Sequence, residues 1–223
     1  MPTATRTRRL SRDKIIAAVT ELLERGGVDA AVSTRTIGEA LRVHPTALYR
    51  HFRDMDELLR EAADSIMTSL VESMPAIGDA AGLDGVACVC RDLRQVLMTH
   101  PGAARVMASG PSRMKNERAF TERLLGLLVE AGLSDNDTIY GYHALVEFTV
   151  GSAAIDSIGP ARSAEEEAAR HRRWRADYLA ASSESFPETV RLANELYPDA
   201  SEQFRFGLDL LIEGLRRRVG SQP

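Results

Sequence analysis

Apolar residues recur at every third or fourth position along nearly the whole chain of 223 residues. In the first such segment, Ile15, Val19 and Leu22 fall on one helical face behind Ser11, a residue type that caps helices. Sustained alternation of apolar and polar residues, which is typical of strands, is nearly absent. The pattern therefore predicts an all-α protein, and the length is ample for a self-sufficient core.

Two short helices are predicted close together in the first quarter of the chain, over 33–41 and 44–52. Only Arg42 and Val43 separate them, and Pro45 occupies the first helical position of the second, where its missing N–H costs nothing. Two short helices joined by a tight turn are typical of a helix-turn-helix. Together with the helix before them, they predict an N-terminal three-helix DNA-binding domain.

A longer helix is predicted to begin at Asp54, which with Glu57 makes a carboxylate version of the capping box, and to end before Pro75 and Gly78. We therefore divide the chain into a basic arm with the helix-turn-helix domain (1–53), a connecting helix (54–78) and a larger helical ligand-binding and dimerisation domain (79–223). In the last part, helical spacing predicts helices over about 84–99, 102–109, 114–131, 135–158, 163–182 and 201–219.

Charge is distributed unevenly behind a formal net charge of −4. Residues 1–53 hold ten Lys and Arg against five Asp and Glu, whereas the remainder of the chain is acidic. A small basic part on a larger acidic body indicates a polyanionic partner for the first part, double-stranded DNA in a helix-turn-helix. The alternative for the cluster of Arg6, Arg8 and Arg9 is a flexible basic tail.

The sequence indicates neither a membrane-spanning segment nor a metal site. No window offers about 18 uninterrupted apolar residues, and the N-terminus lacks the apolar region of a signal peptide, so we expect a cytoplasmic protein without a membrane partner. Cys88 and Cys90 are too few for a zinc site or a disulfide framework, and the five histidines add no ligand spacing. We expect no metal and no cofactor.

Two predicted helices are apolar on more than one face, 144–158 and 204–215. The second has a stripe through Phe204 and Leu208 and another through Phe206 and Leu210. Such helices must be covered on both sides, and a second copy of the chain is a natural cover. The alternative is a core helix of a monomer. The residues expected at a homodimer interface are Phe148, Gly151, Ser152, Leu208, Leu211 and Leu215.

The second helix of a helix-turn-helix lies in the major groove of DNA with its N-terminal residues facing the bases. Here Leu48 and Phe52, four positions apart, must point into the domain core. The residues of this helix that remain for DNA are Pro45, Thr46, Ala47, Tyr49, Arg50 and His51.

The stretch STRTIGEALRVHPTALYRHFRDMDELL resembles the DNA-binding domain of the TetR family of bacterial transcriptional regulators. Leu-Tyr-x-His-Phe before a capped helix is the most specific part of that resemblance. FRFGLDLLIEGLRRR resembles the last helix of the tetracycline-repressor branch, and HPGAARVMASGP and VEFTVGS resemble its middle segments. The resemblance implies a ligand-responsive repressor that dimerises on a near-palindromic operator.

The resemblance also implies roles for single residues in the DNA-binding domain. Thr34 and Arg35 occupy the DNA-facing start of the first of the two short helices, and Arg35 matches a position that reads a guanine. Tyr49 and His51 match residues used on phosphates. Two positions depart from the family: Arg42 replaces the usual turn glycine, and Met55 replaces a phosphate-binding lysine.

The resemblance places a ligand pocket among the middle helices. In the tetracycline repressors a histidine and a glutamate help to hold a magnesium–drug chelate, and the matching positions here are Met107 and Ile155. A thioether and a hydrocarbon suit neither the charge nor the oxygen preference of magnesium. The expected effector is therefore a small hydrophobic, metal-free molecule. The alternative is that these positions are plain core residues. The expected lining residues are Val71, Val89, Leu93, Met107, Leu124 and Ile155.

Two other functions remain open on the residues alone. A small all-α enzyme or ligand carrier could use the C-terminal pocket, with His143, Glu147 and Asp156 as an acid–base set. No activated nucleophile or phosphate-binding glycine loop accompanies them, and an enzyme has no use for the basic first quarter. An architectural DNA-binding protein would not need so much apolar helix. We therefore expect a regulator and not an enzyme.

Overall fold

The computed structural model of the chain describes residues 10–25, 32–79, 81–158 and 163–220, so Arg6, Arg8, Arg9 and the predicted helix stop at Gly26 and Gly27 lie outside the described residues. In these ranges the chain forms helices and turns without a strand, and the all-α prediction is confirmed. The helices are α1 Arg12–Arg25, α2 Thr34–Leu41, η1 Pro45–Arg50, α3 Met55–Ile66, α4 Thr68–Ser73, α5 Gly82–Thr99, α6 Pro101–Ala108, α7 Lys115–Glu130, α8 Asp135–Asp156, α9 Ala164–Leu179, α10 Pro187–Leu192 and α11 Ala200–Arg216.

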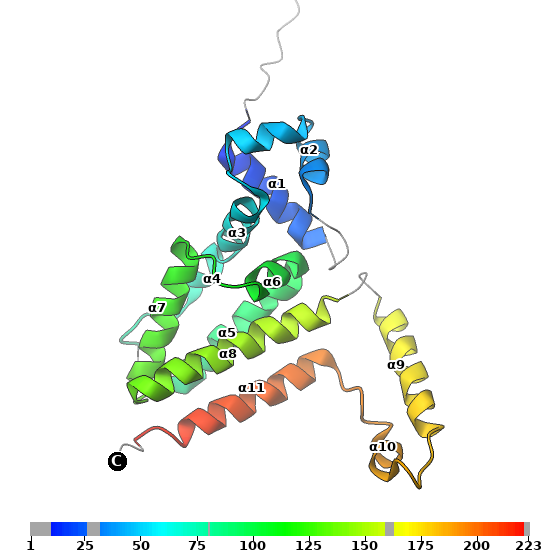
Figure 1. Cartoon of the computed structure of the whole chain (residues 1–223). Coiled ribbons are helices and arrows are strands. Elements are labelled where there is room, and N and C mark those ends of the chain that lie inside the picture. Colours follow the sequence, from blue (N-terminus) through cyan, green and yellow to red (C-terminus); the bar gives the residue numbers. More distant parts are fainter. Residues whose placement is uncertain (1–9, 26–31, 80, 159–162, 221–223) are drawn as a thin grey trace, which may run out of the picture.

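The first three helices form a small head at one end of the molecule (Figure 1). Ile15 and Val19 of α1, Ile37 of α2, Leu48 of η1 and Phe52 are all buried in its core. Because these are the positions that the apolar spacing assigned inward, the three-helix head predicted from the sequence is present.

The turn between α2 and η1 is made by Arg42, which has a left-handed backbone (φ 55, ψ 44). Its N–H donates to the carbonyl of Glu39 at 3.2 Å, and the N–H of Val43 donates to the carbonyl of Gly38 at 2.9 Å. The two helices meet so closely that a Cβ on Gly38 would lie 2.9 Å from the Val43 carbonyl. The chain therefore makes the tight turn without glycine at its left-handed position.

The segment predicted as a helix over 44–52 is a shorter 3₁₀-helix, η1. The His44 side chain caps it, and bonds three residues apart join the Ala47 N–H to the His44 carbonyl and the His51 N–H to the Leu48 carbonyl, both at 2.9 Å. At its end a bond of α-helical span forms, from the Phe52 N–H to the Leu48 carbonyl at 3.1 Å. Helical spacing alone does not distinguish the two helix types in so short a piece.

The connecting helix predicted over 54–78 is interrupted at Met67, which separates α3 from α4. Two bonds form at the break, one tertiary and one local: the Asn116 side-chain amide of α7 donates to the Asp64 carbonyl at 3.0 Å, and the Thr68 hydroxyl donates to the Ser65 carbonyl at 2.8 Å. These side chains take carbonyls that would otherwise serve the continuing helix. The predicted cap at Asp54 is confirmed, since its carboxylate accepts from the Glu57 N–H at 2.8 Å.

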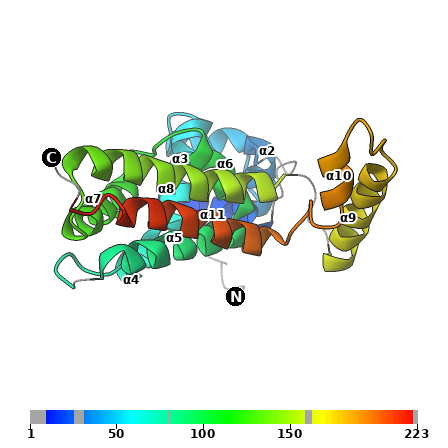
Figure 2. The same cartoon turned by 90° about the horizontal axis from the view of Figure 1, so that it is seen from below.

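The body of the molecule is a helical bundle in which α8 packs against α5, α6, α7 and α11 (Figures 1 and 2). Its buried side chains form one continuous core with those of the head. Figure 2 shows α8 and α11 running alongside each other on one side of the bundle. Among the described residues, no helix is both long enough and apolar enough to cross a membrane.

Helices α9 and α10 form an arm that stands apart from the body in both views (Figures 1 and 2). The arm holds itself together by an aromatic cluster, in which Tyr197 packs against Trp174 and His171 with ring centroids 4.8 and 5.5 Å apart. The Arg175 side chain also donates to the Tyr197 carbonyl at 3.0 Å.

Candidate DNA-binding surface and cavity

The eight predicted DNA-binding residues all lie on α2, on η1 or directly after it. The structure leaves each of them at least partly accessible, with the Arg35 side chain 84% exposed and Tyr49 53% exposed. Thr46 and Arg50 are also exposed, and Thr34, Pro45, Ala47 and His51 are half-buried. The head therefore presents the tip of η1 and the start of α2 on its surface, as a helix-turn-helix must for groove binding.

Arg35 is held by an ion pair in the free protein. Its Nε donates to the Glu39 carboxylate at 2.9 Å, one helical turn along α2, and this bond raises the pKa of Arg35 above its ordinary value. The pair is exposed and contributes little stability.

Arg12 supports the C-terminal end of η1, a role that the sequence reasoning missed. Its guanidinium donates to the His51 carbonyl, lies over the Phe52 ring at 4.2 Å and pairs with Glu57 and Glu61 of α3. The hydrogen bond from Arg12 lowers the pKa of Glu57, and the Arg53 N–H lowers it further. No local signal could have found this cluster, because its partners lie 39 to 49 residues from Arg12.

A cavity of about 550 Å³ lies between α3, the α6–α7 connection, α7 and α8. Its apolar wall includes Met67, Leu93, Val106, Phe120 and Val146. The volume falls in the range of sites for drug-sized molecules.

The structure places two of the six predicted pocket residues, Leu93 and Met107, on the cavity wall. Val89 and Leu124 are buried in the bundle core, and Val71 is half-buried against that core; none of the three lines the cavity. Ile155 is 67% exposed and lies one helical turn beyond Gly151, the last lining residue of α8. The prediction that Ile155 lines the pocket is therefore wrong, because the residue lies beyond the part of α8 that forms the wall.

One wall of the cavity is polar, whereas the lining residues expected from the sequence are all apolar. Asp64 of α3, only 8% exposed, accepts from the backbone N–H groups of Asn116 and Glu117 at 3.2 and 2.8 Å, and so caps α7. The Thr121 hydroxyl bonds the Tyr142 hydroxyl at 2.9 Å and the Glu117 carboxylate at 3.2 Å. Burial, together with the nearby Glu117 carboxylate, raises the pKa of Tyr142, which therefore stays a neutral phenol at neutral pH.

The residues considered as an acid–base set do not form one. His143 and Glu147 line the cavity with 3.7 Å between ring nitrogen and carboxylate, and both are exposed. Asp156 is instead engaged by the buried Arg94 at 2.6 Å, and Arg94 also donates to Ser152 at 2.8 Å. Among the described residues, no group of three His, Cys, Asp or Glu could hold a metal ion.

The residues predicted at a dimer interface are largely covered within one chain. Leu208 and Leu215 are buried beneath α5 and α8, and Phe148 stacks on Phe204 with ring centroids 5.3 Å apart. Ser152 is bonded to Arg94 and Gly151 lines the cavity, whereas the half-buried Leu211 and the buried Leu215 line the surface groove between α8 and α11. The large exposed apolar side chains on these two helices are instead Ile139, Tyr140, Ile155, Phe206 and Leu210.

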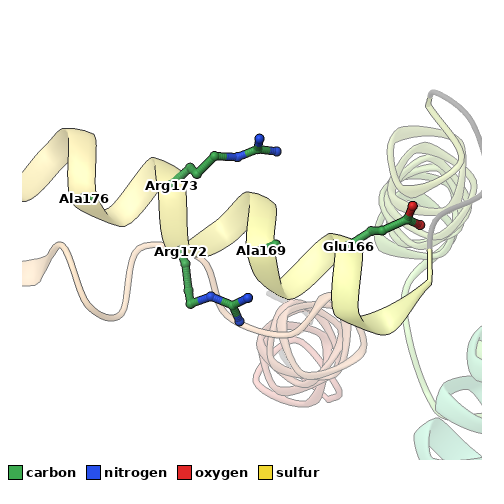
Figure 3. Close-up of a pocket in the computed structure, with 5 residues that line it drawn as sticks. All are labelled: Glu166, Ala169, Arg172, Arg173 and Ala176. Atoms are coloured by element: carbon green, nitrogen blue, oxygen red, sulfur yellow. The ribbon is translucent and has the colours of Figure 1, made fainter.

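A second hollow, of about 490 Å³, is lined by residues of α9 alone (Figure 3). Figure 3 shows Glu166, Arg172 and Arg173 pointing away from the helix in different directions. A hollow lined by one helix is a surface groove of the arm and lacks the enclosing walls of a ligand site.

Two family models match the chain. Residues 15–62 match the model described as bacterial regulatory proteins, tetR family, and residues 75–219 match the model described as tetracyclin repressor-like, C-terminal domain. The two matched segments correspond to the head with most of α3, and to the bundle with the arm.

Relatives and solved structures agree with these matches. An HTH-type transcriptional regulator of Saccharopolyspora erythraea is 28% identical, over 95% of this chain and 86% of the relative. Tetracycline repressor protein class C of Escherichia coli is 31% identical, over 94% of this chain and 92% of its own length. The crystal structure of the TetR family protein ActR of Streptomyces coelicolor in complex with actinorhodin matches with a TM-score of 0.82 and 27% identity, covering 96% of this chain and all of that one.

Proposed function

The chain belongs to the TetR family of bacterial regulatory proteins, and on that premise we propose that it is a ligand-responsive transcriptional repressor. The main observation in support is that helix α3 connects a helix-turn-helix head to a cavity of about 550 Å³. We propose residues 1–53 as the DNA-binding part, 54–78 as the connection and 79–223 as the effector and dimerisation part. Such a regulator acts on DNA in the cytoplasm.

We propose that the head binds its operator through α2 and η1. Arg35 reads a guanine from α2, where a bidentate contact is worth about 1–3 kcal/mol of discrimination. Tyr49 and His51 bind phosphates, and Thr34, Pro45, Thr46, Ala47 and Arg50 contact bases or methyl groups. The accessibility of all eight side chains supports this assignment.

We propose a homodimer built on α8 and α11. Tyr140, Phe206 and Leu210 are large apolar side chains left 60% exposed or more, and the groove beside them lies between the same two helices. A contiguous apolar face of this kind is typical of a protein interface. A two-fold dimer places two heads in successive major grooves about 34–36 Å apart, so the operator is a near-palindrome.

We propose that an effector acts on the head through two contacts. The cavity wall includes Ala63, Asp64 and Met67 of α3, which continues from the head. Helix α6, whose C-terminal end also lines the cavity, meets α1 so tightly that a Cβ on Gly102 would lie 2.8 Å from Leu23 Cδ2. A molecule that shifts either helix moves the head relative to the bundle and changes the spacing of the paired heads.

The effector that we propose is a largely apolar, metal-free small molecule. The apolar wall of the cavity supports this, and so does the ActR complex with actinorhodin, a structure that covers nearly the whole chain. We propose no catalysis, because Asp156 belongs to the Arg94 ion pair and does not join His143 and Glu147 in an acid–base set.

The test is selection of bound DNA from a random pool with the purified chain. We expect one site with two-fold symmetry, bound as a dimer, with affinity that falls steeply as salt rises. Recovery of no enriched sequence, or of a site without symmetry bound by a monomer, would contradict the proposal. The selected operator then serves in gel-shift assays that measure release by candidate effectors.

A further inference from the structure

Three carboxylates line the cavity, and they face few cationic groups. Asp64 and Glu117 lie together at the N-terminal end of α7, and Glu147 lies on α8. The basic side chains of the described lining are Arg60, which pairs with Asp56 outside the cavity at 2.7 Å, and His143, whose ring lies 3.7 Å from Glu147. Among the described lining residues, negative charge is therefore in excess.

The hydrogen-bonding capacity left on this wall is that of acceptors. A carboxylate has about four lone-pair sites. Asp64 uses three of them, for Ser112, Asn116 and Glu117. Glu117 uses two, for the Arg113 N–H at 3.1 Å and the Thr121 hydroxyl at 3.2 Å.

The donors of the same wall are already committed. The Thr121 hydroxyl donates to Glu117 at 3.2 Å, so Tyr142 is the donor in the 2.9 Å bond between the two hydroxyls. The Ser112 hydroxyl donates to Asp64 at 3.3 Å. A ligand group that donates hydrogen bonds, and above all one that is also positively charged, therefore finds free acceptors on this wall. A ligand carboxylate meets like charges and few donors, in a site where low polarity strengthens the repulsion.

We infer that the cavity selects an effector with an apolar ring system and a protonated amine, and that Glu117 with Asp64 binds the amine. This inference rests on the proposed function, which makes the cavity the effector site. Charge-assisted hydrogen bonds are roughly twice as strong as neutral ones, so the amine also outbinds a hydroxyl of the same shape.

The experiment measures binding of three fluorescent probes to the full chain at neutral pH. The probes share the three-ring anthracene body and carry, on the central ring, an aminomethyl group, a hydroxymethyl group or a carboxylate. We expect the amine to bind about tenfold or more tighter than the carboxylate, with the alcohol between them. Fluorescence titration gives the three dissociation constants.

Variants test whether the carboxylates of the cavity wall cause the preference for the amine probe. Glu117→Gln keeps the shape and one acceptor oxygen, and we expect the amine-to-carboxylate preference to fall by about tenfold. The matched control is Glu122→Gln, an exposed residue of the same helix α7 outside the lining, which leaves the preference unchanged. Glu147→Gln neutralises a second, more exposed lining carboxylate and replaces Glu117→Gln as the test if that variant does not fold. We expect it to lower the amine-to-carboxylate preference by a smaller factor.

Gly151→Leu tests whether the probes occupy the cavity. A Cβ on Gly151 meets no heavy atom within 4 Å, so the first atom of the larger side chain enters open space at the wall. We expect it to weaken all three probes together. Unchanged binding to this variant would place the probes elsewhere and overturn the inference.

The outcomes separate the two proposals. If the carboxylate binds as tightly as the amine, or if Glu117→Gln and Glu147→Gln leave the preference intact, the charge inference is wrong and the cavity remains an effector site. If none of the three probes binds, both the inference and the proposed effector site are overturned, while operator selection still tests the DNA-binding function.

Discussion

Arg42 carries a conformational cost that a glycine at the same position would not. Its left-handed backbone (φ 55, ψ 44) ends α2 and begins the turn to η1. For residues with a Cβ that region is disfavoured by about 1–2 kcal/mol. The family resemblance marked the position as unusual, and the structure shows that the chain keeps the glycine geometry with a different residue.

Replacing Arg42 by glycine is expected to stabilise the protein by about 0.5–1 kcal/mol, because relief of the strain exceeds the extra freedom of glycine in the unfolded chain. Thermal or urea unfolding measures the change. Arg42→Ala is the control, since it removes the same charge and keeps the strain. Equal effects of both variants would show that charge, and not backbone geometry, decides stability here.

Arg35→Ala is expected to relax sequence preference at one base pair in each half-site and to weaken the preferred operator by about 1–3 kcal/mol. Tyr49→Phe removes a phosphate contact instead, so it weakens all sequences alike. Binding to a set of operators with single base changes distinguishes the two patterns. A uniform loss for Arg35→Ala would remove its assignment as a base-reading residue.

The helices of the head are joined by charged and aromatic contacts rather than by apolar packing alone. Arg12 connects α1 to α3 through Glu57 and Glu61, and it reaches the end of η1 through His51 and Phe52. In this way the first residue of α1 fixes how η1 is presented. The orientation of the DNA-facing element therefore depends on contacts between helices.

Glu57 gives the head a defined response to acid. Its pKa is lower in the folded protein, because Arg12 and the Arg53 N–H bond the ionised carboxylate. A carboxylate with a lowered folded pKa contributes stability above its ordinary pKa, and that contribution is lost as the pH falls through the folded value. In Glu57→Gln we expect lower stability at neutral pH and a shallower loss on acidification. Unfolding curves across that pH range would contradict the assignment if both proteins kept the same slope.

The apolar side chains left exposed on α8 and α11 provide a test of the dimer. Leu210→Asp is expected to convert the dimer to monomer, because the interface would bury an unpaired carboxylate. Val129→Asp is the matched control, since Val129 is exposed to a similar degree, 53% against 60%, and belongs to α7 rather than to these two helices. Sedimentation or light scattering reads the mass. A dimer that survives Leu210→Asp would move the interface elsewhere.

Across the whole molecule, the cavity lies where the bundle meets the connection to the head. Its wall takes Asp64 from α3 and Glu117 from α7, and the N–H of Glu117 donates to Asp64 at 2.8 Å. A ligand at this wall therefore contacts the bond that joins the two helices. A free-energy coupling of about 1–3 kcal/mol between ligand and operator is typical of such an arrangement.

The magnesium–tetracycline chelate is expected to leave the operator complex of this protein intact. Met107 lines the cavity with a thioether that is a poor ligand for magnesium, and Ile155 lies outside the cavity. A gel shift with the selected operator measures release, and the class C tetracycline repressor of Escherichia coli serves as the positive control. Release at micromolar chelate would show that magnesium is held by other groups.

Local sequence determined the helices, their caps and the inward residues of the head. Ser33 and Asp54 cap α2 and α3, and Ile15, Leu48 and Phe52 are buried, as spacing predicted. These features could be predicted because a cap or an amphipathic face is decided within a few residues. The same reasoning located the candidate DNA surface, since exposed residues of a short helix follow from its buried ones.

Only the tertiary structure decided the break at Met67, the lining of the cavity and the coverage of α11. The Asn116 side chain, 52 residues away in sequence, bonds the Asp64 carbonyl beside the break. The Asp64 carboxylate lies at the cavity because it caps α7, which is about equally distant in sequence. Apolar spacing marks Leu208 and Leu210 alike as inward candidates, and the packing of α11 on α5 and α8 buries the first and leaves the second exposed. Periodicity records that a side chain prefers burial, whereas the partner that buries it is set by how distant helices pack.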